Sequence, residues 1–192
     1  MGKNRLEAFS DGVLAIIITI MVLGLQVPHG EHLQVLKPLV PAFSIYVLSF
    51  IYLGICWNNH HHMLHTATMV TGSILWANLH LLFWLSLIPF TTAWMGENHF
   101  AAIPVAFYGV VLMMAAVAYF ILQRFIIGTQ GQDSVLKRAV GRDVKGKLSL
   151  LFYAAAIGFS FWRPWMALSL YSMVALIWLV PDKRIEKVLR TG

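Results

Sequence analysis

Charged residues are scarce in this chain of 192 residues, where Asp, Glu, Lys and Arg together make up only 11%. Soluble domains carry about a quarter charged residues, whereas here 59% of the residues are apolar and the mean hydropathy is +0.73. The net charge of +6 does not indicate a nucleic-acid partner, because the basic residues lie in short segments between apolar runs and not among exposed aromatic residues. The composition argues against a water-soluble globule and indicates a polytopic membrane protein.

The chain also lacks the residue patterns of common enzymes and metal centres. Cys56 is the single cysteine and lies inside an apolar run, so neither a disulfide framework nor a cysteine-rich metal site is available. Among the acidic residues only Asp11 falls where a membrane would surround it, so a catalytic pair of carboxylates is missing. The sequence has no HExxH motif, glycine-rich phosphate loop or nucleophile elbow. We therefore expect no enzyme activity, no cofactor and no bound metal.

Apolar runs predict an all-α fold with six membrane spans in a single domain over residues 1–192. A helix needs about 20 mostly apolar residues to cross the hydrocarbon core, and six stretches approach this length. They lie at about 6–27, 38–59, 70–94, 101–127, 148–162 and 165–180. Pro89 predicts a kink in the third span, and Arg163 with Pro164 predicts a tight turn between the last two. Residues 128–147 form the long polar loop, with a helical part expected around 134–140.

The distribution of Lys and Arg predicts the orientation. If the N-terminus is cytoplasmic, twelve of the fourteen basic residues fall inside and only Lys37 and Arg163 fall outside. This bias predicts that both termini are cytoplasmic, that the number of spans is even, and that the protein lies in the cell (inner) membrane. The basic loop 128–147 would then lie beside anionic lipid headgroups. Glu7 and Asp11 interrupt the first apolar run, so no cleaved signal peptide is expected.

Asp11 requires an explanation, because an aspartate inside a bilayer costs several kcal/mol unless it is paired or hydrated. In one interpretation, Ser10 and Asp11 cap a helix that begins at residue 12. In the other, the helix begins near Lys3, and Asp11 lies a turn or two below the headgroups and faces other helices. The second interpretation requires polar partners at the same depth.

Such partners are present on the second and third predicted spans. Trp57 and His60 lie at the end of the second span, and Asn78 lies about two turns into the third. Indole, imidazole and amide groups can satisfy carboxylate and hydroxyl acceptors. We therefore expect a buried network among Ser10, Asp11 and these three residues, whose role is either to fix helix packing or to take part in gating.

A cluster of histidines, His60, His61, His62 and His65, raises the question of a metal site. His61 and His65 are spaced i, i+4, which places both imidazoles on one helix face. No Asp, Glu or Cys lies close in sequence to complete a closed site, so we interpret the tract as an interfacial segment.

The first predicted span carries a stripe of branched apolar residues. Ile16, Ile20 and Leu23 recur at i, i+4 and i+7, and Thr19 lies beside them. Taken alone, such a stripe is typical of a membrane helix that faces lipid or a neighbouring helix.

Three ordered motifs change this interpretation. The segment from Arg5 to Asp11 has the form R-x-x-x-F-S-D and includes Phe9 and Ser10, while Trp57 to His60 has the form W-x-x-H. Asn78-Leu79 and the later Pro89-Phe90-Thr91 fit the pattern N-L…P-F-[ST]. Over its first three spans the chain resembles the TMEM175 potassium-channel family. Its length and number of spans are similar to those of the prokaryotic single-repeat members, which assemble as homotetramers.

The resemblance implies a specific arrangement. The first helices would surround a central pore, with Ile16 at the constriction, Ile20 and Leu23 as further apolar layers, and Thr19 as a pore-facing hydroxyl. Arg5, Phe9, Ser10 and Asp11 would anchor the pore helix to the second and third spans, through Trp57, His60 and Asn78. Like the family, the chain has no T-V-G-Y-G filter. It is expected to conduct potassium in preference to sodium, with a homotetramer, the lipid bilayer and monovalent cations as its partners.

An apolar ring closes a pore by excluding water. Potassium holds its water less tightly than sodium, so a slightly widened ring can favour potassium without coordinating carbonyls. One alternative is a secondary transporter that couples proton or metal movement through Asp11 and the histidines, although such transporters often show inverted repeats and none is evident here. The other alternative is a membrane scaffold that transports nothing.

Overall fold

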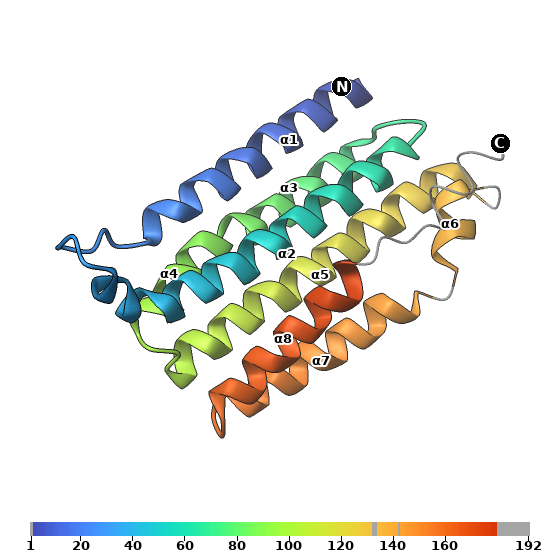
Figure 1. Ribbon diagram of the computed structural model, residues 1–192. Helices are drawn as coiled ribbons and strands as arrows, with labels where there is room; N and C mark the ends of the chain where they lie inside the picture. The colour runs from blue at the N-terminus through green and yellow to red at the C-terminus, as the bar shows by residue number, and fades with distance from the viewer. Residues whose placement is uncertain (1, 132–133, 142, 180–192) are drawn as a thin grey trace.

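A computed structural model describes residues 2–131, 134–141 and 143–179, and its regular structure in these ranges is helical. In these described ranges, two short 3-10 helices, η1 and η2, accompany eight α-helices. The elements are α1 (Lys3–Ile20), η1 (Met21–Gly24), η2 (Leu33–Leu39), α2 (Val40–His65), α3 (Gly72–Ser86), α4 (Ile88–Glu97), α5 (Ala102–Gln130), α6 (Val135–Val140), α7 (Val144–Ser160) and α8 (Pro164–Leu179). The long helices run side by side, with α1 at one edge, α5 in the middle, and α7 and α8 at the other edge (Figure 1).

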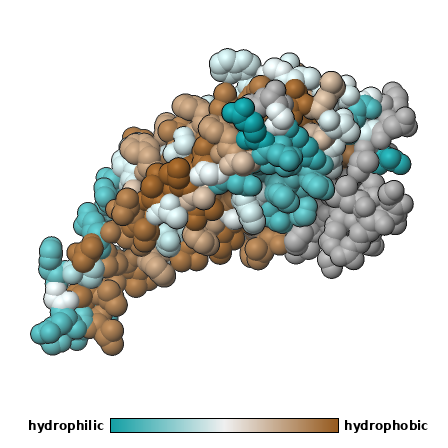
Figure 2. Space-filling view, turned by 90° about the horizontal axis from the view of Figure 1, so that it is seen from above, coloured by the Kyte–Doolittle hydropathy of each residue, from teal (hydrophilic) through white to brown (hydrophobic). Residues whose placement is uncertain are grey.

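The bundle has two distinct ends. The start of α1, the connection between α2 and α3, and the short helix α6 lie together at one end, which we call the N-terminal end (Figure 1). The turn after α1, the end of α4 and the connection between α7 and α8 lie toward the opposite end. Hydrophobic residues cover the body between the ends, and hydrophilic residues gather toward both of them (Figure 2). This distribution is that of a multi-pass membrane protein.

Helix length distinguishes two groups of segments. Within the described residues, four segments are long and apolar enough to cross a membrane, namely 3–24, 33–65, 72–97 and 102–130. The helix α8 is apolar but has only 16 residues, and α7 has 17 residues with two lysines in its first turn. The expected crossings by these two helices therefore remain a prediction.

The start of α1 decides between the two interpretations of Asp11. The helix begins at Lys3 with Gly2 as its N-cap, and it continues through Ser10 and Asp11 to Ile20. The capping interpretation is therefore wrong, because both side chains lie two turns inside the helix. The helix α2 ends at His65, six residues beyond the predicted boundary of the second span, so the whole histidine cluster is helical.

Proline and polar caps explain the remaining boundaries. Pro89 lies in the first turn of α4, where it interrupts the third span, and α3 ends at Ser86. The predicted loop 128–147 is shorter at both ends and contains α6, whose N-cap Ser134 accepts a hydrogen bond from the backbone N–H of Lys137. Asp143 caps α7 by accepting from Gly146 N–H. Of the residues on which the orientation rests, Arg142, Lys183, Arg184, Lys187 and Arg190 lie outside the described residues, as does Val180, the predicted end of the last span.

The core between α5, α7 and α8 is built around three buried tyrosines, Tyr108, Tyr153 and Tyr171. The rings of Tyr108 and Tyr171 meet edge to face at 5.5 Å, and the Tyr171 hydroxyl donates to the carbonyl of Val105 over 3.1 Å. Glycine is required at position 109, because a Cβ there would overlap the Tyr171 hydroxyl. This contact lets α8 pack closely against α5.

Candidate functional site

A buried chain of hydrogen bonds joins three helices near the N-terminal end. His60 on α2 contacts Asn78 on α3, with 2.7 Å between His60 Nε2 and Asn78 Oδ1. Asn78 Nδ2 donates to Ser10 Oγ on α1 over 2.9 Å. All three side chains are buried. This chain of hydrogen bonds fixes α1 to both α2 and α3 through polar groups that lipid cannot satisfy.

The donors in this chain point in one direction. The Ser10 hydroxyl donates to the Leu6 carbonyl over 2.9 Å, so its oxygen is free to accept from Asn78. Because the Asn78 amide nitrogen faces Ser10, its oxygen faces His60, and His60 Nε2 must therefore carry a proton. His60 thus donates to Asn78, and Asn78 donates to Ser10 on α1. The sequence alone does not give this direction.

Asp11 belongs to a second contact outside the buried chain. The indole N–H of Trp57 donates to Asp11 Oδ1 over 2.8 Å, and the Trp57 ring is partly exposed. Eight residues earlier on α1, Lys3 Nζ donates to the carbonyl of His65 over 2.6 Å. The structure therefore brings together the residues expected to form one network, but it divides them between a buried chain and a ladder of contacts along the edge of α1 and α2.

The histidines next to Trp57 form a column of rings. The His61 ring stacks at 6.3 Å from Trp57 and 6.2 Å from His65, along one face of α2. Glu7 lies on α1 midway between Lys3 and Asp11, and its Oε1 is shielded and has no hydrogen-bond partner in the described part of the chain. In the same part of the chain, no three His, Cys, Asp or Glu side chains come together in a way that could hold a metal ion.

The opposite side of α1 is exposed and almost entirely apolar. The exposed fractions are 61% for Ile16, 44% for Ile20 and 80% for Leu23, and Thr19 is exposed beside them. The Thr19 hydroxyl donates to the carbonyls of Ala15 and Ile16, so its oxygen is presented outward as an acceptor. We call Ile16, Thr19, Ile20 and Leu23 the exposed stripe.

The exposed stripe continues beyond the α-helix. Leu23 lies in η1 and not in the α-helical register that its spacing predicts. A 3-10 helix has three residues per turn, so Leu23, three residues after Ile20, stays on the same side. Toward the N-terminus, Phe9 and Arg5 are also exposed. The motif residues thus divide between a bonded inner face and a free outer face.

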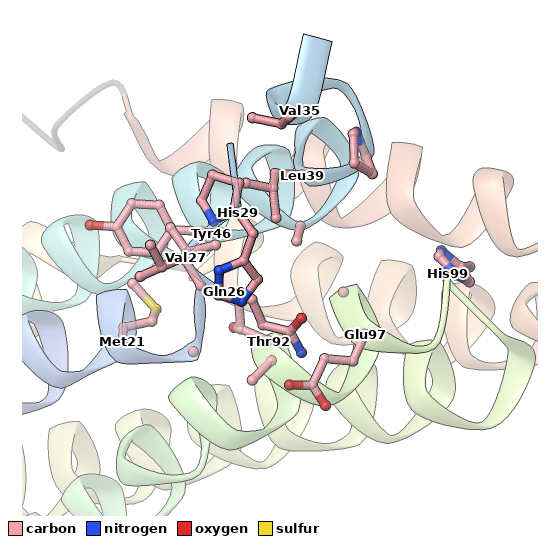
Figure 3. Close-up of a pocket in the computed structure, with 17 residues that line it drawn as sticks. Met21, Gln26, Val27, His29, Val35, Leu39, Tyr46, Thr92, Glu97 and His99 are labelled. Atoms are coloured by element: carbon pink, nitrogen blue, oxygen red, sulfur yellow. The ribbon is translucent and has the colours of Figure 1, made fainter. Parts of the chain in front are cut away.

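A cavity of about 630 Å³ lies at the opposite end of the bundle, between the turn after α1, η2, the start of α2 and the end of α4. Gln26, His29, Thr92 and Glu97 are the polar side chains toward its centre, and His99 lies farther along (Figure 3). No motif in the sequence marks this cavity, because its lining comes from three separate segments.

The sequence pattern also gives no sign of a hydroxyl cluster between α2, α4 and α5. Ser49 Oγ lies 2.7 Å from Thr92 Oγ1 and 3.0 Å from the Tyr108 hydroxyl, and all three side chains are buried. Isolated hydroxyls in apolar helices are common, and their spacing alone does not show which ones meet.

The family described as endosomal/lysosomal potassium channel TMEM175 matches residues 5–89. A potassium channel of Chryseobacterium sp. is 58% identical over 190 residues, covering 99% of both chains. A potassium channel of Streptomyces collinus is 30% identical over 190 residues, covering 91% of this chain and 90% of that protein. The endosomal/lysosomal proton channel TMEM175 of Gallus gallus is 35% identical over 83 residues, covering 37% of this chain and 17% of that protein.

The fold also matches a solved structure. The crystal structure of a lysosomal potassium-selective channel TMEM175 homologue from Chamaesiphon minutus has a TM-score of 0.80 at 24% identity, and the match covers 94% of this chain and 97% of that one. Both the family and these relatives are channels and not enzymes. The relative from Chryseobacterium is similar over almost the entire length, so the chain belongs to the TMEM175 family.

Proposed function

We propose that this chain is the subunit of a passive, potassium-preferring channel in which α1 lines the pore. The observation that carries the proposal is the contrast between the two faces of α1. Its inner face is bonded to α2 and α3 through Ser10 and Asp11, whereas its outer face presents the exposed stripe. The bacterial relatives are named potassium channels, which supports potassium as the conducted ion.

A pore requires more than one subunit, because a single α1 at the edge of the bundle cannot enclose a path (Figure 1). A closed ring of identical subunits is the usual way to complete such a path. We propose a homotetramer in which four copies of the exposed stripe face the central axis. Each subunit would cross the membrane six times, with α3 and α4 together forming the third crossing and α7 and α8 forming the last two.

Ile16 is the proposed constriction. A ring of four isoleucine side chains excludes water and closes the pore by dewetting. When the ring widens, an ion passes after it sheds part of its hydration shell, which favours potassium over sodium. The outward oxygen of Thr19, one turn away, offers an acceptor to the partly dehydrated ion. Ile20 and Leu23 extend the apolar wall.

We propose that the N-terminal end of the bundle lies in the cytoplasm and the protein in the cell membrane, because basic residues favour the cytoplasmic side. In the described residues this end carries Lys3, Arg5, Lys137, Arg138, Lys145 and Lys147. The cavity beside Glu97 would then face the outside, next to the outer mouth of the pore. The Glu97 carboxylate would attract cations toward that mouth.

The test is potassium and sodium flux through the purified full-length protein in liposomes, with Ile16→Asn compared with Leu151→Asn. Leu151 is a matched control, because it is 63% exposed on α7 at the other edge of the bundle. We expect Ile16→Asn to wet the constriction, raise flux and reduce the discrimination between the two ions. Leu151→Asn should change neither. Unchanged conductance and discrimination in Ile16→Asn would overturn the assignment of the constriction.

A second candidate function is proton permeation, because the relative from Gallus gallus is named a proton channel. A wetted apolar pore gives protons a path along its water molecules. The measurement is liposome acidification under a pH gradient with potassium held equal on both sides. A potassium flux that saturates and depends on a proton gradient would instead favour the coupled transporter, and absence of any flux would favour a scaffold.

A further inference from the structure

Asn58 on α2 and His80 on α3 are polar side chains on partly exposed positions of two apolar helices. Asn58 makes no hydrogen bond in the part of the chain that the structure describes. His80 lies eight residues, about 12 Å, after the start of α3, and the hydrocarbon core is about 9 Å shorter than the segment 72–97. A centred segment therefore places His80 within the core, where lipid offers no partner to a polar group.

A contact with Trp84 shows which group His80 offers to a partner. The Trp84 indole donates to His80 Nε2 over 2.9 Å. An indole N–H can only donate, so Nε2 accepts and the ring carries its proton on Nδ1. No described residue accepts a hydrogen bond from this Nδ1. His80 therefore offers a donor, and the amide of Asn58 contains an acceptor oxygen.

The two side chains lie at the same level along the bundle. The helices α2 and α3 run in opposite directions and are joined by the contact between His60 and Asn78. Asn58 lies two residues before His60, and His80 lies two residues after Asn78. Both steps lead away from the N-terminal end by the same distance, about 3 Å.

The register is the same farther along the pair of segments. Gly96 of α4, the helix that follows α3, packs against Ala42 of α2. Gly96 lies 18 residues after Asn78, and Ala42 lies 18 residues before His60. Equal steps from the contact of His60 with Asn78 therefore reach equal levels on the two segments.

Asn58 and His80 nevertheless point to opposite sides of the subunit. Two residues of an α-helix correspond to a turn of about 200°, and His60 and Asn78 point toward each other. Asn58 and His80 therefore point outward, away from each other. Exposed apolar residues share these outer faces, namely Val47 and Ile51 on α2, Trp76 and Phe83 on α3, and Phe90 on α4. We call Val47, Ile51, Gly54 and Asn58 the α2 flank, and Trp76, His80, Phe83 and Phe90 the α3 flank.

The helix α1 lies between the two flanks, because Asp11 contacts α2 and Ser10 contacts α3. In a closed ring whose subunits direct α1 to the axis, the α2 flank of each subunit meets the α3 flank of the next. Rotation about an axis along the membrane normal does not move a residue along that axis. Asn58 therefore meets the level of His80 of the partner subunit.

The shapes of the two flanks are also complementary at this level. Gly54 lies one turn before Asn58, and a Cβ at this position would meet nothing within 4 Å. Phe83 lies three residues after His80 and is 55% exposed. Along the bundle, Gly54 and Phe83 differ in level by only about 1.5 Å. Small residues let membrane helices approach closely, so the large ring has an open position to pack over.

We propose that the α2 flank of one subunit binds the α3 flank of the next. His80 Nδ1–H donates to Asn58 Oδ1 across this interface, and Phe83 packs over Gly54. Each subunit gives Asn58 to one neighbour and His80 to the other, so the same contact closes the ring. This inference rests on the homotetramer proposed above, and it identifies the two faces that meet and the hydrogen bond between them.

The test is thiol cross-linking of the full-length protein in liposomes, in a Cys56→Ser background that removes the cysteine of the core. The double variant Asn58→Cys with His80→Cys is treated with a short, membrane-permeant bis-methanethiosulfonate. We expect a ladder of covalent dimers, trimers and tetramers on a denaturing gel. The two positions face opposite flanks, so the reagent does not join them within one subunit. Each single cysteine variant should stay monomeric on the gel.

Two matched pairs control for level and for face. Asn58→Cys with Phe90→Cys uses the same flanks at the wrong level, because Phe90 lies ten residues, about 15 Å, beyond His80. Asn58→Cys with Leu151→Cys uses an exposed position of α7 at the other edge of the bundle. Thiols this far apart are not bridged by a short reagent, so each control should give less than about a tenth of the product.

Asn58→Leu tests the hydrogen bond in a chain that keeps Cys56. An interhelical hydrogen bond of average strength corresponds to about a threefold change in association for each interface. The fraction of tetramer, measured by native mass spectrometry over a dilution series, should fall accordingly. His80→Phe should have a similar effect, and the double variant should be no weaker than either single variant, because one bond is lost only once. Ser169→Ala, exposed on α8 and bonded only within its own helix, should change nothing.

A tetramer that conducts ions without forming the Asn58–His80 product, or that forms as much product with Phe90→Cys, would overturn this interface and leave the channel intact. Additive effects of Asn58→Leu and His80→Phe would overturn the hydrogen bond. A cross-linked ladder in a protein that conducts no ion would support the interface and overturn the channel. A monomeric protein would overturn the interface and the tetramer together.

Discussion

The direction of the hydrogen bonds in the buried chain of His60, Asn78 and Ser10 predicts how much stability is lost when Asn78 is replaced. In Asn78→Leu the volume is nearly kept, but both interhelical hydrogen bonds are lost. Ser10 still donates to the Leu6 carbonyl, so it keeps one partner. His60 Nε2–H, in contrast, is left buried with no acceptor. The cost of this variant therefore falls mainly on the histidine.

Interhelical hydrogen bonds in membrane proteins contribute about 0.6 kcal/mol on average and about 1.7 kcal/mol at most. Leaving a buried donor unpaired adds about 1–3 kcal/mol. We expect Asn78→Leu to lower the free energy of unfolding by about 2–3 kcal/mol. The double variant His60→Phe with Asn78→Leu should recover a large part of this loss, because replacing both partners by apolar groups removes the unpaired donor.

The assay is unfolding of the purified protein in mixed micelles with increasing SDS, followed by tryptophan fluorescence, for the two single variants and the double variant. Ser44→Ala is the control, because Ser44 is exposed and donates only to the Val40 carbonyl of its own helix. It should change the stability by less than about 0.5 kcal/mol. If Asn78→Leu is as stable as the unmodified protein, or if the double variant is no more stable than Asn78→Leu, the unpaired-donor argument is refuted.

Two further predictions concern Gly109 and the contact of Asp11. Gly109→Ala forces the Tyr171 hydroxyl aside and should cost about 1–3 kcal/mol in the same unfolding assay. Gly128→Ala, where a Cβ meets nothing within 4 Å, should cost nothing. Equal effects of the two variants would contradict the close contact. Trp57→Phe removes the indole donor to Asp11 at a partly exposed site and should cost at most about 1 kcal/mol. Asp11→Asn keeps an acceptor for the indole, so it should assemble normally with unchanged preference between potassium and sodium in liposomes. An altered preference in a normally assembled protein would show that Asp11 acts on the ion.

Several features of the fold could be predicted because they depend on local properties of the chain. Hydropathy located the long apolar segments, and Pro89 located the break between α3 and α4. The ordered motifs indicated the family, which the comparisons confirm. The boundaries were less accurate at polar ends. The second predicted span ends at residue 59, whereas α2 continues to His65.

The candidate site could be predicted only in part. The spacing of Asp11, Trp57, His60 and Asn78 placed polar groups at one depth, and the structure brings them together. The division into a buried chain and an exposed contact was not predictable, because it depends on how α1 is rotated about its axis. The hydroxyl cluster of Ser49 was not predictable either, since its partners lie 43 and 59 residues away.

The sequence by itself determined that this protein is helical, lies in a membrane and belongs to one family, because hydropathy, proline and motif spacing are properties of neighbouring residues. Only the tertiary structure decided which side of α1 is bonded and which is exposed. In a soluble protein, the hydrophobic periodicity would reveal the buried face of a helix. In a membrane, lipid is as apolar as the protein core, so the same apolar residues suit either surroundings, and the contacts between helices decide the outcome.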